Sequence, residues 1–117
     1  MKSIYYSPYN LDIFLYKDPI EFANSSYKPF GEIPKGAIYD SDDTMCTGFI
    51  VKGEYKELHL YIEENCSKKE IFELLAHEIG HLQPKISINL NDEKKANMYE
   101  IFMGHVFSIY ELIFHLF

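Results

Sequence analysis

Two histidines and a glutamate stand at a spacing that suits metal chemistry. His77, Glu78 and His81 form the pattern H-E-x-x-H. On a helix, residues four apart lie one turn above each other on one face, so both imidazoles can reach one zinc ion at about 2.0–2.1 Å. The glutamate beside the first histidine can then take a proton from zinc-bound water. Because the motif is short, two satisfied histidines beside a solvated glutamate are the alternative interpretation.

The segment that carries this pattern predicts a helix from Ser67 to Leu82. Ser67 followed by Glu70 is a capping box, in which a hydroxyl and a carboxylate satisfy the backbone N–H groups that open a helix. Gln83-Pro84 then ends the helical run, because proline cannot continue it. Apolar residues at helical spacing predict the buried face: Ile71, Leu74, Leu75 and Ile79.

Two strand-like runs precede this helix, at residues 45–51 and 58–62, and the residues between them predict a hairpin. In the second run apolar residues alternate with polar or aromatic ones, so one face points to the core and His59 is expected to be exposed. The first run is a candidate edge strand that binds a substrate chain by strand addition. A further strand is expected at residues 36–40.

Prolines interrupt residues 1–36, which predicts short helices there, over residues 10–17 and from Asp18-Pro19 to Ala23. At the other end, a long helix is predicted from Glu93 towards Phe117, with Asn91 or Asp92 as its N-cap. Its expected core stripe consists of Ala96, Tyr99, Met103, Val106, Tyr110 and Ile113.

A catalytic zinc site needs a third protein ligand besides the two histidines, together with one open position. Glu93 can face back from the start of the last helix, and Asn97 one turn later can hydrogen-bond the free nitrogen of a ligating histidine. The alternative for Glu93 is an ordinary first-turn acid stabilised by the helix dipole. The rival ligands are Glu100, Asp92 and His105, and a structural site closed by His105 or Glu100 is a further possibility.

Composition limits the classes of protein to which the chain can belong. Its 117 residues, 47% of them hydrophobic, predict a single domain over 1–117 with one modest core. A net charge of −7 argues against direct nucleic-acid binding. Cys46 and Cys66 lack metal-knuckle spacing and are expected to be free thiols in a reducing cytoplasm. No signal peptide or membrane-spanning run is apparent, which predicts a cytoplasmic protein without membrane contact, and the apolar tail 106–117 is expected to pack as a helix.

Four stretches resemble the ImmA/IrrE family of zinc peptidases: 48–51, 58–62, 76–81 and 93–99. In that family a small hairpin precedes an H-E-[LI]-G-H helix, and an E-x-E-A-[ND]-x-F segment follows. Here Lys95 stands where the family usually has a second acid, and Glu100 where a small residue is common. The resemblance, over about residues 45–103, implies an α+β fold: a small zincin-like, minigluzincin-type domain whose short sheet packs on the motif helix and a long C-terminal helix.

The resemblance also implies an activity, that of a zinc-dependent endopeptidase. Carried over by position, it implies His77, His81 and Glu93 as Zn²⁺ ligands, Glu78 as general base and Asn97 as the residue that orients a ligand. The implied substrate is a specific protein, such as a repressor of a phage or mobile element. A non-catalytic zincin-like protein that inhibits or sequesters a partner is the alternative. Peptide hydrolysis also needs an oxyanion donor, for which the candidates are Tyr39, Tyr99, His105 and Tyr110.

Overall fold

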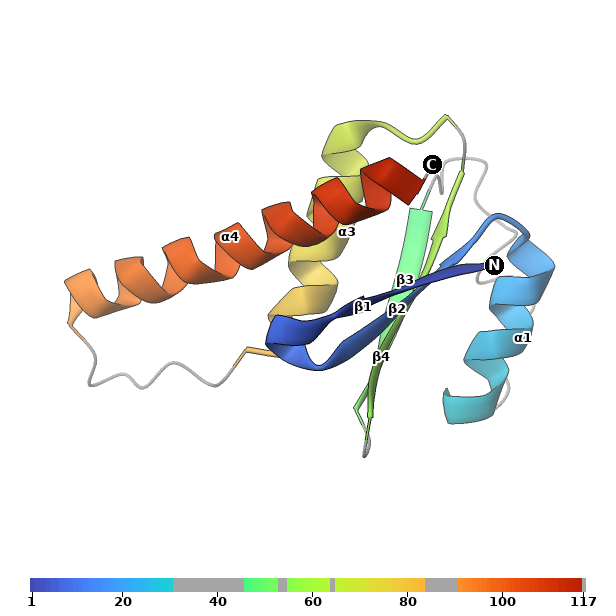
Figure 1. The fold of residues 1–117 in the computed structure, drawn as a ribbon, viewed down its shortest axis with the longest axis horizontal. Coiled ribbons are helices and arrows are strands. Elements are labelled where there is room, and N and C mark those ends of the chain that lie inside the picture. The colour runs from blue at the N-terminus through green and yellow to red at the C-terminus, as the bar shows by residue number, and fades with distance from the viewer. Residues whose placement is uncertain (31–45, 53–54, 64, 84–90, 117) are drawn as a thin grey trace.

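A four-stranded sheet lies between helices on its two faces in this computed structural model (Figure 1). The structure describes residues 1–30, 46–52, 55–63, 65–83 and 91–116, and the side chains of 23, 26–30 and 116 lie outside that description. The strands are β1 (Lys2–Tyr6), β2 (Leu11–Tyr16), β3 (Cys46–Lys52) and β4 (Lys56–Ile62). The helices are η1 (Ser7–Tyr9), a single 3-10 turn, then α1 (Pro19–Phe30), α3 (Lys68–Gly80) and α4 (Asp92–Leu116). The predicted α+β class is confirmed.

The strands follow the order β1-β2-β4-β3 across the sheet. β1 and β2 pair antiparallel through the η1 turn, where Asn10 adopts the left-handed conformation with a φ of 50°. β2 pairs in parallel with β4, and β4 pairs antiparallel with β3. The predicted hairpin is therefore confirmed as β3 and β4, although Met45 and the expected strand at 36–40 lie outside the described residues.

The helix predicted over residues 10–17 is wrong, because this segment forms the inner strand β2. Leu11, Ile13 and Leu15 are buried at every second position, which is the period of a strand with one face on a core. β2 lies between β1 and β4, so strand partners on both sides satisfy its backbone. The short, proline-bounded segment 10–17 has no clear helical period in its sequence, and pairing within the sheet determines its conformation.

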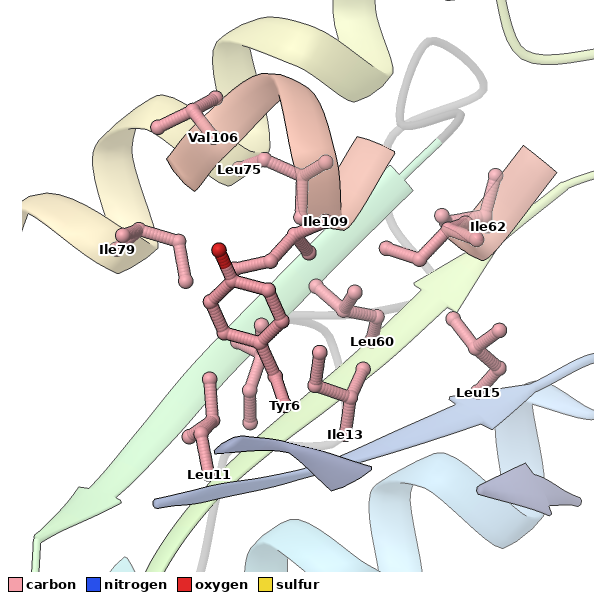
Figure 2. Close-up of a cluster of buried hydrophobic side chains, with 12 residues drawn as sticks. Tyr6, Leu11, Ile13, Leu15, Leu60, Ile62, Leu75, Ile79, Val106 and Ile109 are labelled. Atoms are coloured by element: carbon pink, nitrogen blue, oxygen red, sulfur yellow. The ribbon is translucent and has the colours of Figure 1, made fainter. Parts of the chain in front are cut away.

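The main core lies between the sheet and the helices α3 and α4 (Figure 2). Leu75 and Ile79 of α3 and Ile109 of α4 point onto the face of the sheet formed by alternate residues of β2 and β4. The ring of Tyr6 enters this cluster, and its hydroxyl points towards the helices. The predicted apolar stripe of α3 is thus confirmed at its two most buried positions.

The opposite face of the sheet corrects the expectation for His59. His59 is only 8% exposed, because α1 covers this face together with the aromatic residues of β2 and β3. The imidazole ring stacks between Phe14 and Phe49, with 4.7 Å between ring centroids on each side. Side chains of β4 alternate between the two faces of the sheet, as predicted. Both faces are buried, however, and the sequence of one strand does not reveal that a helix covers the second face.

α1 is longer than the predicted helix, which was expected to end near residue 23. Within it the hydroxyl of Ser25 donates a hydrogen bond to the carbonyl oxygen of Phe22 at 2.7 Å, which satisfies a polar side chain inside the helix. A serine hydroxyl can make such a local hydrogen bond inside a helix as well as in a turn, so serine does not by itself end a helix. The helix therefore continues past the serines to Phe30.

α4 confirms the predicted last helix and its cap. The side-chain oxygen of Asn91 accepts a hydrogen bond from the backbone N–H of Lys94 at 2.8 Å. The predicted core stripe holds only in the second half, where Val106 and Ile113 are buried together with Ile109, which the stripe omitted. In the first half Tyr99 is 62% exposed, because these turns extend beyond α3 and the sheet (Figure 1). Among the described residues, no helix combines the length and apolar character needed to cross a membrane.

Candidate metal centre

The helix α3 carries the H-E-x-x-H pattern and is fixed along its length. At its start the Ser67 hydroxyl accepts a hydrogen bond from the backbone N–H of Glu70 at 3.2 Å, which confirms half of the predicted capping box. Its middle is fully buried at Leu75 and Ile79. Beyond its end, the side-chain amide of Gln83 donates a hydrogen bond to the Tyr9 hydroxyl at 2.8 Å. The motif residues therefore stand on a helix that the core and the η1 turn hold in place.

His77 and His81 lie together on the exposed side of α3. Their ring centroids are 5.0 Å apart, and the rings are nearly perpendicular, at 88°. Two imidazoles that share a tetrahedral zinc ion at about 2.0–2.1 Å have centroids about 5 Å apart, so the pair has the separation that one ion requires. The predicted pairing of these two side chains on one helical face is confirmed.

Glu78 turns the other way and is 7% exposed. It packs beside β3, where a Cβ at Gly48 would lie 3.7 Å from the Cγ of Glu78 and only 2.7 Å from the Cδ2 of Leu60. A side chain at position 48 would therefore displace Leu60, so glycine lets β3 pack closely against β4, while Glu78 lies at an ordinary contact distance. Burial raises the pKa of the Glu78 carboxyl, while the nearby His77 and His81 act to lower it.

The proposed third ligand does not join the histidine pair in this structure. Among the described residues, no carboxylate, thiol or imidazole forms a group with His77 and His81 in which all ligand atoms lie within 4.8 Å of one another. Glu93 and Asn97 stand exposed on the first half of α4, as do the rivals Asp92 and Glu100. The ligand set of His77, His81 and Glu93 therefore stays a prediction, of which the structure brings together two members.

His105, the remaining rival, belongs to a different set of contacts. Its Nδ1 lies 2.6 Å from the hydroxyl oxygen of Tyr6, and its ring centroid lies 4.7 Å from that of Tyr9. These contacts tie the middle of α4 to the β1–β2 turn. A hydrogen-bonded nitrogen is not available as a metal ligand, so His105 has at most its other ring nitrogen to offer.

A second group of possible metal ligands, not foreseen from the sequence, lies at the other end of α3. The ligand atoms of Cys46, Cys66 and Glu70 all lie within 4.8 Å of one another, so this group could hold a metal ion. Both cysteines are free thiols, as predicted, but they are half-buried neighbours. Burial raises the pKa of the Cys46 thiol, and Glu70 and Glu73 raise it further. A Cys-Glu pair four residues apart was visible in the sequence, whereas Cys46 joins only through strand pairing.

Comparison with known proteins identified no relative of the chain. No family model, curated protein or solved structure matches the chain significantly. The resemblance to the ImmA/IrrE family therefore stays a prediction from the sequence motifs.

Proposed function

We propose that the chain is a zinc-dependent endopeptidase of the ImmA/IrrE type, with a small zincin-like fold, that cuts a specific protein such as a phage or mobile-element repressor. The observation that carries the proposal is the pair of exposed imidazoles, 5.0 Å apart on α3, with the buried carboxyl of Glu78 between them in the sequence of the same helix. A water and a peptide group can reach the histidine side of the helix from solvent. The resemblance supplies Glu93 as the third ligand.

The chemistry that a zinc ion would supply when held there is polarisation of the scissile carbonyl and acidification of a water molecule. Glu78 would take the proton from the attacking water and then deliver it to the leaving amine. Its position beside β3 keeps the carboxyl out of bulk solvent and close to both histidines.

β3 offers a place for the substrate chain. It pairs with β4 on one side and is the edge of the described sheet on the other. A peptide that added to this edge would form main-chain hydrogen bonds with β3. Because Gly48 lies beside Glu78, such a peptide would pass next to the proposed base.

Completion of the site requires the first turn of α4 to approach the histidines. From Asp92 to Ile101 no residue of α4 is buried or packs against the main core, whereas Phe102 packs against it and His105 contacts Tyr6 and Tyr9. Moving the turns before Phe102 would therefore remove little apolar surface from a core, and the free-energy cost is correspondingly small. The arrangement of α4 is compatible with a ligand that docks when the ion binds.

The decisive experiment compares wild type with Glu78→Gln. Each zinc-loaded protein is incubated with a proteome-derived peptide library, and new peptide ends are detected by mass spectrometry. Loss of the general base should lower the cleavage rate by about 10²–10⁴-fold while the bound zinc is retained. The matched control is Glu73→Gln, which removes an exposed carboxylate from the same helix and should leave the rate unchanged.

Two outcomes would count against the peptidase. One is wild-type protein that holds zinc at the histidines but yields no new peptide ends. The other is a Glu78→Gln variant that cleaves as fast as wild type, since the proposed base would then do nothing.

The second candidate is a non-catalytic binding protein that inhibits or sequesters its partner. The observation that favours it is a set of large apolar side chains on α4 that are more than half exposed: Tyr99, Ile101, Phe107 and Phe114. The rings of Phe107 and Phe114 each lie beside that of Tyr110, with centroids 6.4 Å and 6.3 Å away, and contiguous exposed apolar groups are typical of partner surfaces. For a pure binding protein, Glu78→Gln should leave inhibition of the partner intact, whereas Phe107→Glu should weaken it.

A further inference from the structure

We propose that Cys46, Cys66 and Glu70 form a second metal site, which takes one thiophilic divalent cation of the zinc class. The site lies at the start of α3, whereas the histidine pair lies at the end of the same helix. It is independent of the proposed peptidase function and would exist in a chain that cuts nothing.

Three elements bring the ligands together. Cys46 begins β3 and is the register partner of Ile62 at the end of β4. After Ile62 the chain turns, and the backbone N–H of Cys66 donates a hydrogen bond to the carbonyl oxygen of Glu63 at 3.0 Å. Glu70 follows in the first turn of α3. The ends of the hairpin and the beginning of the helix therefore meet at one point.

The distances fit a single ion. The three ligand atoms lie within 4.8 Å of one another, and the Sγ of Cys66 lies 3.5 Å from the Oε2 of Glu70. Two thiolates bound to zinc at about 2.3 Å in tetrahedral geometry are about 3.8 Å apart. Side-chain rotations that move the ligand atoms by no more than about 1 Å therefore suffice to reach this geometry.

The ligand types select the class of cation. Two thiolates and one carboxylate suit zinc and its spectroscopic substitutes, cobalt and cadmium, whereas magnesium and calcium prefer oxygen ligands alone. The cysteines are only half-buried and Glu70 is exposed, so the ion has access from solvent and a water molecule can occupy the fourth position.

A bound ion would join the beginning of the edge strand to the first turn of the helix that carries the histidines. In addition to its apolar packing, this junction has the weak 3.6 Å contact of the Cys46 Sγ with the carbonyl oxygen of Glu70. Metal–ligand bonds are much stronger, and an ion that binds only the folded chain stabilises it by mass action. Zinc should therefore raise the Tm of the whole protein.

The test is a titration of the reduced full chain with Co²⁺ in the presence of a phosphine reductant. We expect thiolate-to-cobalt charge-transfer absorption, and in a His77→Ala/His81→Ala double variant, where the histidine pair cannot compete for the metal, it should saturate at one equivalent. A His77→Ala/His81→Ala double variant should keep this absorption, while Cys46→Ser and Cys66→Ser should each lose most of it. Glu70→Gln should weaken binding by about tenfold or more, because a direct ligand matters at least as much as an outer partner. Glu73→Gln, one turn away, is the matched control.

A wild-type titration without charge-transfer absorption would overturn the proposal, as would a Cys66→Ser variant with unchanged absorption. If the serine variants fail to fold, alkylation of wild type decides the matter, because Cys46 and Cys66 are the two cysteines of the chain. An excess of Zn²⁺, enough to occupy the histidine pair as well, should slow alkylation of both thiols, and an unchanged rate would contradict the site. Failure of the peptidase would appear separately, as absence of cleavage with this absorption intact.

Discussion

The two ends of α3 present opposite relations between sequence and structure. At the C-terminal end, His77, Glu78 and His81 stand within one helical turn, and their spacing reveals them in the sequence. At the N-terminal end, a ligand group assembles from a strand, a turn and a helix. The first set is evident in the sequence but incomplete in the structure. The second is not evident in the sequence, yet its members already lie together.

The difference lies in what holds the partners. Cys46 is fixed opposite Ile62 by the backbone pairing of β3 and β4, so its distance from Cys66 follows from the sheet. Glu93 stands on the first turns of α4, before Phe102, where no residue is buried or packs against the main core, so the core does not fix its distance from the histidines. A metal centre is therefore rigid where sheet pairing sets it, and adjustable where an exposed helix end supplies a ligand.

The largest expected effect comes from a residue between the two ends. Leu75 is fully buried in the middle of α3, and Leu75→Ala should lower the free energy of unfolding by about 2–5 kcal/mol. Because both ligand groups depend on the same helix, metal affinity should fall at both ends. Urea unfolding and a Co²⁺ titration measure the two effects.

Lys69→Ala serves as the control, since Lys69 is exposed and its 3.9 Å approach to Glu73 joins two solvated side chains. It should change stability by no more than about 0.5 kcal/mol. If Leu75→Ala were equally mild, α3 would not be packed as described, and the comparison between its ends would fail.

The next largest effect concerns zinc binding at the C-terminal end of α3, at the histidine pair alone. In a Cys66→Ser background, where thiolate binding is removed, Glu93→Ala should weaken zinc binding at the histidines by about tenfold or more, and Glu100→Ala should not. The measurement is zinc content after dialysis, compared with the parent. Equal zinc content in the two variants would show that Glu93 is not the third ligand, and the other candidate ligands would then have to be tested.

The smallest effect concerns the sheet face that lies away from both ligand groups. Burial lowers the pKa of His59 below its usual 6.5, and Glu57, 3.5 Å from Nε2, opposes this shift only in part. In the neutral ring, Nδ1 can accept a hydrogen bond from the Tyr16 hydroxyl, 2.8 Å away, while the N–H at Nε2 faces the carboxylate of Glu57. Tyr16 and Glu57 are thus the titratable groups that contact it.

Because the folded chain binds this proton less readily than the unfolded chain, stability should fall as the pH drops below about 6.5 and level off below the folded pKa. Above pH 6.5 the His59 contribution is fully present. Urea unfolding of wild type and His59→Gln from pH 7.5 to 5 measures it, and the variant should show a shallower pH slope. Parallel slopes would show that His59 is not the group responsible.

Predictions from the sequence succeeded where a single element contains the whole pattern. The start of α3 at Ser67, the Asn91 cap of α4 and the hairpin runs were all predicted from local residues. Predictions failed where a neighbouring element decides. The segment 10–17 became a strand because β1 and β4 pair with it, and His59 became buried because α1 covers its face.

The sequence by itself determined the helix that presents His77 and His81, because a 3.6-residue period and a cap are encoded within one segment. It also supplied the carboxyl of Glu78 between the two histidines. Only the tertiary structure decided which distant groups meet. Strand register placed Cys46 beside Cys66 and Glu70, and packing of α4 through Val106, Ile109 and Ile113 left Glu93 apart from the histidines. Such contacts depend on how the elements dock. Their free energy comes from packing between two elements, so the sequence of one segment does not determine it.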